Sequence, residues 1–187
     1  MEPKCRTVVF RGFLPSSSEI GGSTNPQSCL MKMITDARSN KFAEITNATV
    51  DPEGTTHEKE TKHFINCEMV WWFGKSSEQY RISGMLQFIG DDESDSHLQS
   101  CRKQQWGNLS DVAREQFYWL EPGVPYQGES KVPTGGRDEE GKVLSPPTNF
   151  LLMVLNPKKC DYLKLGENFR QVDTLEGDSW KVDRVNP

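Results

Sequence analysis

The chain has 187 residues and a formal net charge of −5, with 22 lysines and arginines against 27 aspartates and glutamates. This length is typical of one domain with one hydrophobic core, which we expect to span residues 1–187. No stretch approaches the ~20 consecutive apolar residues of a membrane helix. The negative charge argues against a protein held on nucleic acid by bulk positive charge. We therefore expect neither a membrane nor a nucleic acid among its partners.

The five cysteines are widely spaced and form no Cys-x-x-Cys pair. The N-terminal residues lack the apolar core of a secretory signal. Both features predict free thiols and a cytoplasmic protein. An organelle is the alternative if a transit segment precedes this sequence.

Runs of β-branched and aromatic residues dominate the first half of the chain. The run RTVVFRGF at residues 6–13 is continuous, which predicts a strand buried on both faces. A short helix is predicted at 40–47, and polar surface loops at 15–27 and 51–62. Two apolar runs flank a tight turn at 74–77 and predict an antiparallel hairpin. The strands predicted in this half are 6–13, 29–35, 64–73 and 79–89.

The second half combines a broken helix, one long loop and the closing strands. Residues 97–119 predict a helix in two pieces around Gly107, with Ser110 capping the second piece. Residues 122–147 are rich in proline and glycine and predict a long loop. Four closing strands are predicted at 149–156, 161–165, 169–174 and 180–185. Strands outnumber helices, so we predict a mainly β fold, a small antiparallel barrel with peripheral helices.

No motif of metal-dependent or covalent catalysis stands out. The GxSxG nucleophile elbow, the P-loop and the GxGxxG fingerprint are all absent. The three histidines, His57, His63 and His97, are interpreted as surface residues rather than metal ligands. We therefore expect no bound metal and no side chain that acts as a covalent nucleophile.

The segment TDARSNK at residues 35–41 lies between a predicted strand and a predicted helix. A helix N-terminus presents backbone N–H groups and partial positive charge, which attract anions. The hydroxyl groups of Thr35 and Ser39, together with Arg38 and Lys41, would complete a compact phosphate site. The alternative is a plain strand–helix turn in which Ser39 or the preceding aspartate caps the helix.

Two arginines, Arg6 and Arg11, bracket the first predicted strand. They are either the solvated ends of an apolar strand or the ligands of two separate phosphoryl groups. Gln79 and Arg81 share the polar face of the hairpin. That face meets either solvent or a ligand or dimer cleft.

Several sequence blocks occur in a fixed order along the chain. They are RTVVFRGF at 6–13, TDARSNK at 35–41, EQYRISG at 78–84, LSDVAREQFYW at 109–119, DYL at 161–163 and WKVDRVNP at 180–187. Together these blocks resemble the FMN-binding pyridoxamine 5'-phosphate oxidase-like proteins, and in particular the branch found in cyanobacteria, plants and fungi. The resemblance covers most of the chain.

The resemblance implies a split β-barrel that binds FMN, usually as a homodimer with two FMN molecules in the clefts between subunits. It further implies which residues contact the cofactor. Arg6, Ser39 and Lys41 match the residues that hold the FMN phosphate, and Gln79 matches a glutamine that contacts FMN. The expected cofactor-binding set is Arg6, Val9, Thr35, Ser39, Asn40, Lys41 and Gln79.

The resemblance also implies a substrate, a phosphorylated B6 vitamer. Pyridoxamine or pyridoxine 5'-phosphate would be oxidised to pyridoxal 5'-phosphate by hydride transfer to the flavin. Arg11, Arg114 and Arg170 are the expected substrate-binding residues, Arg11 standing where the oxidases have lysine. Two alternatives stay open: an FMN-binding module that is not an oxidase, and a truncated, inactive paralogue with a short N-terminal part.

Overall fold

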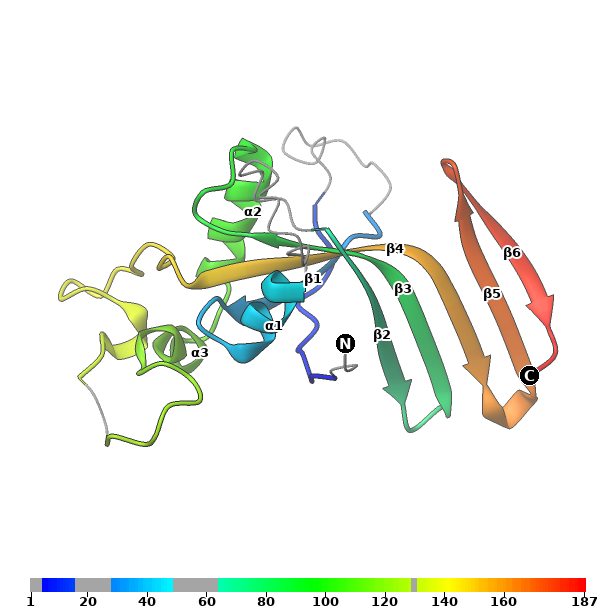
Figure 1. Ribbon diagram of the computed structural model, residues 1–187, viewed down its shortest axis with the longest axis horizontal. Coiled ribbons are helices and arrows are strands. Elements are labelled where there is room, and N and C mark those ends of the chain that lie inside the picture. The colour runs from blue at the N-terminus through cyan, green and yellow to red at the C-terminus, as the bar shows by residue number, and fades with distance from the viewer. Residues whose placement is uncertain (1–4, 16–27, 49–63, 129–130) are drawn as a thin grey trace.

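The computed structural model describes residues 5–15, 28–48, 64–128 and 131–187 (Figure 1). Six strands of this part form one antiparallel sheet: β1 (Met31–Asp36), β2 (Ile65–Phe73), β3 (Glu78–Ile89), β4 (Phe150–Lys164), β5 (Phe169–Glu176) and β6 (Ser179–Val185). The α-helices are α1 (Asn40–Ala48), α2 (Ser96–Gly107) and α3 (Asp111–Glu115). Short 3-10 turns are η2 (Gln116–Tyr118), η3 (Thr134–Gly136) and η4 (Leu165–Glu167). The loops predicted at 15–27 and 51–62 lie outside the described residues, apart from Pro15.

The sheet is organised around β4, its longest strand. β3 pairs along one edge of β4, while the other edge is shared, β1 pairing with residues 150–155 and β5 with residues 159–164. The β5–β6 hairpin therefore stands apart from β1 at one end of the molecule (Figure 1). Within the described ranges the outer edges of β2 and β6 have no partner strand, so the sheet is split and not closed. The predicted mainly β fold with peripheral helices is confirmed.

Two strands that are predicted on either side of Pro157 form a single strand in the structure. Instead of strands at 149–156 and 161–165, a single strand of 15 residues forms β4. Proline usually ends a strand because it lacks an N–H group. Here a bulge accommodates it: Ser83 pairs with Lys159, but Gly84 pairs with Pro157, so one residue of β4 is left over.

Residues 6–13 do not form the predicted strand with two buried faces. The segment follows β1 only near its end, where Arg11 N donates to the Lys32 carbonyl oxygen at 2.8 Å. Val8 packs against the core, whereas Val9 is 58% exposed. A continuous apolar run thus has one exposed face, because no strand covers it within the described residues.

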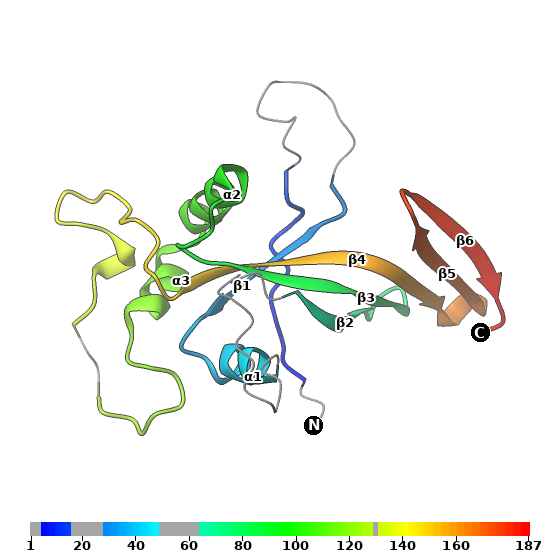
Figure 2. The ribbon, with the colours of Figure 1, turned by 45° about the horizontal axis from the view of Figure 1, so that its top comes forward.

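Helices α1 and α2 cover opposite faces of the sheet (Figure 2). Phe42 of α1 packs edge-on against Phe88 of β3, with ring centroids 5.2 Å apart, in the core that also contains Met33. Cys101 of α2 belongs to a second core with Ile89. Because neighbouring side chains of a strand point to opposite faces, even-numbered residues of β3 face the α1 side and odd-numbered ones the α2 side.

The predicted break in the helix at 97–119 is confirmed. α2 ends at Gly107, and the Ser110 hydroxyl oxygen caps α3 by accepting a hydrogen bond from Ala113 N at 3.3 Å. Residues 122–147 are mostly irregular, as predicted, with the short turn η3 among the described part. In the part of the chain that the structure describes, no helix is both long and apolar enough to cross a membrane.

Candidate functional site

The turn between β1 and α1 brings together three of the predicted phosphate ligands. Thr35 is buried near the end of β1, and Ser39 and Lys41 stand on either side of the first residue of α1. Lys41 Nζ donates to Thr35 Oγ1 at 2.8 Å, and the Thr35 and Ser39 hydroxyl oxygens lie 3.4 Å apart. Ser39 Oγ donates to the carbonyl oxygen of Asp36 at 2.7 Å. We call Thr35, Ser39 and Lys41 the cradle.

Positive charge is concentrated at the cradle. Burial lowers the pKa of Lys41, and the nearby charge of Arg6 lowers that pKa further. No carboxylate of the described residues forms an ion pair with Lys41, whereas Arg6 Nη2 lies 2.9 Å from each carboxylate oxygen of Glu44. One partly desolvated cation therefore lies near a second cation. A doubly charged phosphate would stabilise this arrangement.

Asn40 lies between the cradle residues Ser39 and Lys41, whereas no contact of the described structure joins Val9 to the cradle. Asn40 is the exposed first residue of α1, a position whose backbone N–H has no partner within the helix. Its side-chain amide lies beside Gly123, 3.7 Å from the position of an ideal Cβ there. Val9 is exposed on the N-terminal segment that carries Arg6. Neither residue adds charge, so any contact with a phosphorylated ligand would be through hydrogen bonds or apolar surface.

The side chain of Arg38 contacts other groups than the predicted phosphate. Its Nε and Nη2 atoms form a fork on the Asp36 carboxylate, with distances of 3.0 and 2.7 Å. Its Nη1 donates to the Trp119 carbonyl oxygen at 2.8 Å, and Nη2 also donates to the Phe117 carbonyl oxygen at 3.2 Å. The hydrogen bond to Asp36 raises the pKa of Arg38. Its donors are engaged within the fold, so Arg38 does not complete the phosphate site.

Arg11 offers a donor that lacks an acceptor. Its Nε atom is buried and has no hydrogen-bond partner among the described residues. An unsatisfied buried donor costs about 1–3 kcal/mol, so a ligand acceptor at this position would be stabilising. Arg11 follows Arg6 by five residues, at most ~17 Å along an extended chain. This spacing suits two phosphoryl groups with a planar ring system between them.

Gln79 and Arg170 lie together but far from the cradle. Both pair with Leu163 across the sheet, and Arg170 forms a fork on Asp161 with distances of 3.0 and 2.9 Å. Thr35 pairs with residue 151 of the same strand, twelve residues earlier. The two positions are thus separated by about 40 Å of β4. Gln79 also faces the α2 side of the sheet, whereas the cradle lies on the α1 side.

Arg114 is buried at 2% exposure and serves as an internal contact. Its Nε donates to the Gly135 carbonyl oxygen at 2.8 Å, and its Nη atoms contact the Leu109 carbonyl oxygen and Asp111. These bonds tie α3 to the turn η3. The predicted substrate contact stays a prediction, and the guanidinium group would have to leave these partners to make it.

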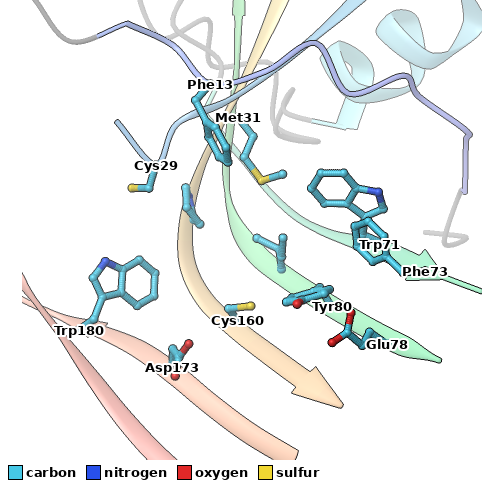
Figure 3. Close-up of a pocket in the computed structure, with 12 residues that line it drawn as sticks. Phe13, Cys29, Met31, Trp71, Phe73, Glu78, Tyr80, Cys160, Asp173 and Trp180 are labelled. Atoms are coloured by element: carbon cyan, nitrogen blue, oxygen red, sulfur yellow. The ribbon is translucent and has the colours of Figure 1, made fainter. Parts of the chain in front are cut away.

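A cavity of about 480 Å³ was not anticipated from the sequence; it opens between β2–β4 and the β5–β6 hairpin (Figure 3). Its aromatic lining residues are Phe13, Trp71, Phe73, Tyr80 and Trp180. Glu78 and Asp173 are acidic, and no lysine or arginine is among the described lining residues. Hydrogen bonds from Ser76 and Tyr162 lower the pKa of Glu78, so it stays charged. The negative lining of this cavity disfavours a phosphate group there.

His97 is not the simple surface residue that the sequence suggests. Its Nε2 atom lies 3.1 Å from the Pro15 carbonyl oxygen and 3.7 Å from Cys101 Sγ, one helical turn away. The spacing of four residues on α2 is the signal that would have found this contact. His57 and His63 lie outside the described residues. Among the residues that the structure describes, no three side chains of the metal-ligating types come together.

Three comparisons connect this chain and its fold to known proteins. A family described as "Pyridoxamine 5'-phosphate oxidase, FMN-binding domain" matches residues 1–90. Pyridoxine/pyridoxamine 5'-phosphate oxidase 2 of Arabidopsis thaliana is 30% identical over 190 residues, covering 99% of this chain and 81% of the plant protein. A crystal structure of a pyridoxamine 5'-phosphate oxidase-related, FMN-binding protein from Nostoc punctiforme PCC 73102 superposes with a TM-score of 0.70. It is 29% identical, and the match covers 97% of this chain and 80% of that one.

The split antiparallel sheet and these matches together define an FMN-binding domain. The chain belongs to the FMN-binding pyridoxamine 5'-phosphate oxidase family. FMN, the cofactor of this family, fits the described residues at its phosphate end. Lys41 is partly desolvated beside Arg6, and the two cradle hydroxyl groups lie within one turn of it.

Proposed function

We propose that this chain, as a single domain, binds FMN with its phosphate on the cradle and oxidises pyridoxamine or pyridoxine 5'-phosphate to pyridoxal 5'-phosphate. The observation that carries the proposal is the partly desolvated Lys41 beside Arg6, with no carboxylate of the described residues in ion-pair contact with Lys41. Bound FMN supplies a hydride acceptor, which no side chain of the protein can replace. The residues of the chain then have two tasks: to bind the two phosphorylated molecules and to orient them.

Lys41 and Arg6 bind the FMN phosphate in this proposal, with the Thr35 hydroxyl group donating to its oxygens. The Ser39 hydroxyl group donates to the phosphate as well once it gives up its bond to the Asp36 carbonyl oxygen. Arg6 must exchange Glu44 for the phosphate. The Arg6–Glu44 pair is solvent-exposed, with side chains 43% and 33% accessible. Such pairs contribute only about 0–1 kcal/mol, so the exchange costs little.

Arg11 binds the substrate phosphate in this proposal. Its buried Nε lacks an acceptor in the described chain, and the spacing from Arg6 leaves room for the flavin and vitamer rings between the two phosphates. Holding both rings in one orientation is how the protein would accelerate hydride transfer.

Gln79 and Arg170 can join this site only from a second copy of the chain. About 40 Å of β4 and the thickness of the sheet separate them from the cradle of their own chain. We therefore propose a homodimer in which the Gln79 face of one copy meets the cradle of the other. Each dimer would then contain two equivalent sites, as two-fold symmetry requires. We propose that this dimer works in the cytoplasm.

A second candidate is a flavin-binding module without B6 oxidation. Arg114 favours it, because its guanidinium group is buried and bonded to carbonyl oxygens of its own domain. The group expected to contact the substrate is therefore already engaged within its own domain.

One titration tests both candidates. The purified protein is titrated with FMN, and then with pyridoxamine 5'-phosphate under anaerobic conditions, while the visible absorption of the flavin is recorded. Tight binding followed by bleaching would support the oxidase. Binding without bleaching would leave the flavin-binding module, and no binding of FMN would refute both.

A further inference from the structure

We propose that Arg38 is a positioning residue for the flavin phosphate: it contacts no phosphate itself, but fixes the turn that carries Ser39 and Lys41 and neutralises Asp36 beside the cradle. This inference rests on the proposed FMN site. It assigns a task to a residue that the sequence analysis places among the phosphate ligands.

Arg38 and Asp36 form a fork of two hydrogen bonds. Nε lies 3.0 Å from Oδ1 and Nη2 lies 2.7 Å from Oδ2, so two parallel donors bind two carboxylate oxygens. The backbone N–H of Arg38 also donates to Oδ1 at 2.8 Å. Paired charge-assisted bonds of this kind fix direction as well as distance. This residue pair therefore restrains the conformation of the turn between β1 and α1.

Hydrogen bonds also connect Arg38 and Asp36 to a segment that is distant in the sequence. Arg38 donates to the carbonyl oxygens of Phe117 and Trp119, which lie at the end of the helical segment. Asn149 Nδ2 bridges the same groups, donating to Asp36 Oδ2 at 2.9 Å and to the Phe117 carbonyl oxygen at 3.0 Å. The cradle turn is thus fastened to two elements that do not belong to it.

Arg38 also neutralises the negative charge of Asp36. The Asp36 side chain is only 13% accessible, and its charge is close enough to Lys41 to raise the pKa of that lysine. Without Arg38, an uncompensated carboxylate would lie beside the phosphate and repel it. The main-chain carbonyl oxygen of Asp36 also accepts a hydrogen bond from the Ser39 hydroxyl group. A shift of Asp36 would therefore move a phosphate ligand as well.

The experiment compares two flavins that differ only in the phosphate. Dissociation constants for FMN and for riboflavin are measured by quenching of flavin fluorescence. We expect the wild-type protein to prefer FMN, and Arg38→Ala to weaken FMN binding about 10-fold or more, the scale of charge-assisted contacts. Riboflavin binding should change less than about twofold, because it makes no use of the cradle. Arg38→Lys keeps the charge but loses the fork. Its affinity for FMN should lie between those of the wild-type protein and Arg38→Ala.

Two further variants separate positioning from general damage. Arg137→Ala is the matched control: Arg137 also forks an aspartate, Asp111, but away from the cradle. It should lower the melting temperature and leave the ratio of FMN to riboflavin affinity unchanged. Asp36→Asn in the Arg38→Ala background removes the repelling charge, and should recover part of the lost FMN affinity.

These measurements distinguish a failure of the positioning role from a failure of the proposed FMN site. A wild-type protein with no preference for FMN over riboflavin would refute the phosphate site itself. A wild-type preference that Arg38→Ala and Arg38→Lys both retain would overturn the positioning role alone. Equal loss of both flavins in Arg38→Ala would also overturn it, because the residue would then be only structural. If Arg38→Ala fails to fold, Arg38→Lys decides by the same ratio.

Discussion

Gly84 of β3 lies directly opposite Pro157 of β4, and an ideal Cβ on Gly84 would stand 2.1 Å from the carbonyl oxygen of Asn156. The close approach is to main-chain atoms, which cannot rotate away as a side chain would. The bulge that lets β4 pass through Pro157 therefore requires glycine at position 84.

We expect Gly84→Ala to destabilise the fold by at least about 1–3 kcal/mol, the usual cost of overpacking. Urea unfolding measures this loss. Gly107→Ala is the matched control, because no neighbouring atom lies within 4 Å of an ideal Cβ at that position. It should be neutral or slightly stabilising through the unfolded state. Equal stability of the two variants would contradict the role given to Gly84.

Lys41→Ala should weaken FMN binding about 10- to 100-fold, since it removes a charge-assisted contact to the phosphate. Flavin fluorescence titration gives the affinity. Lys103→Ala serves as the control, because Lys103 is exposed on α2, on the other face of the sheet. Unchanged FMN affinity in Lys41→Ala would remove the cradle from the cofactor site.

FMN affinity should also fall at alkaline pH. The ordinary lysine pKa of 10.5 is lowered at Lys41 by burial and by Arg6, so Lys41 loses its charge at a lower pH than an exposed lysine does. The phosphate carries most of its second charge above about pH 6. Affinity should therefore be highest above neutrality and decline as the pH approaches 10.5. In Lys41→Arg the guanidinium group stays protonated, and the decline should be much smaller. An equal decline in both proteins would assign the titration to another group.

Arg11→Ala should raise the KM for the vitamer phosphate by about 10-fold or more and spare FMN binding, because Arg11 is proposed to contact the substrate phosphate alone. Steady-state oxidation kinetics give the KM, and fluorescence titration gives the FMN affinity. Lys32→Ala is a neighbouring cationic control, because Lys32 lies in β1 and its main-chain carbonyl oxygen accepts a hydrogen bond from Arg11 N. Parallel loss of FMN and substrate binding in Arg11→Ala would place this residue at the cofactor phosphate instead.

Complementation tests the shared site. Copies carrying Lys41→Ala and copies carrying Gln79→Ala are unfolded, mixed in equal amounts and refolded together. Random pairing makes half of the dimers mixed, and each mixed dimer contains one intact site, so about a quarter of all sites should bind FMN normally. Each variant refolded alone should show none. Normal FMN binding by the Gln79→Ala variant alone would refute the contribution from a second copy.

The parts of the fold that depend on neighbouring residues could be predicted from the sequence. The hairpin of β2 and β3 follows from two apolar runs around a turn, and Ser110 caps α3 because capping needs only the next three residues. The cradle was predictable for the same reason, since Thr35, Ser39 and Lys41 lie within one strand–helix turn.

The features that depend on distant partners could not be predicted. β4 continues through Pro157 only because Gly84 lies opposite it, and no local pattern contains that pairing. Arg38 has the charge and the sequence position of a phosphate ligand. Its N–H groups instead donate hydrogen bonds to carbonyl oxygens about 80 residues away. The exposed face of residues 6–13 likewise reflects which strands lie nearby, and a run of apolar residues does not reveal that.

Because β1 and β5 occupy different halves of the same edge of β4, the β5–β6 hairpin is joined to the rest of the sheet through the six pairs at residues 159–164. The hairpin carries Arg170, proposed for the substrate, while β1 leads into the cradle, proposed for the cofactor. Opening or replacing the hairpin leaves the pairing of β1 with β4 intact. A lineage can therefore change Arg170 without disturbing β1, whereas Arg11, the other residue proposed for the substrate, is hydrogen-bonded to β1 and is constrained together with the cradle.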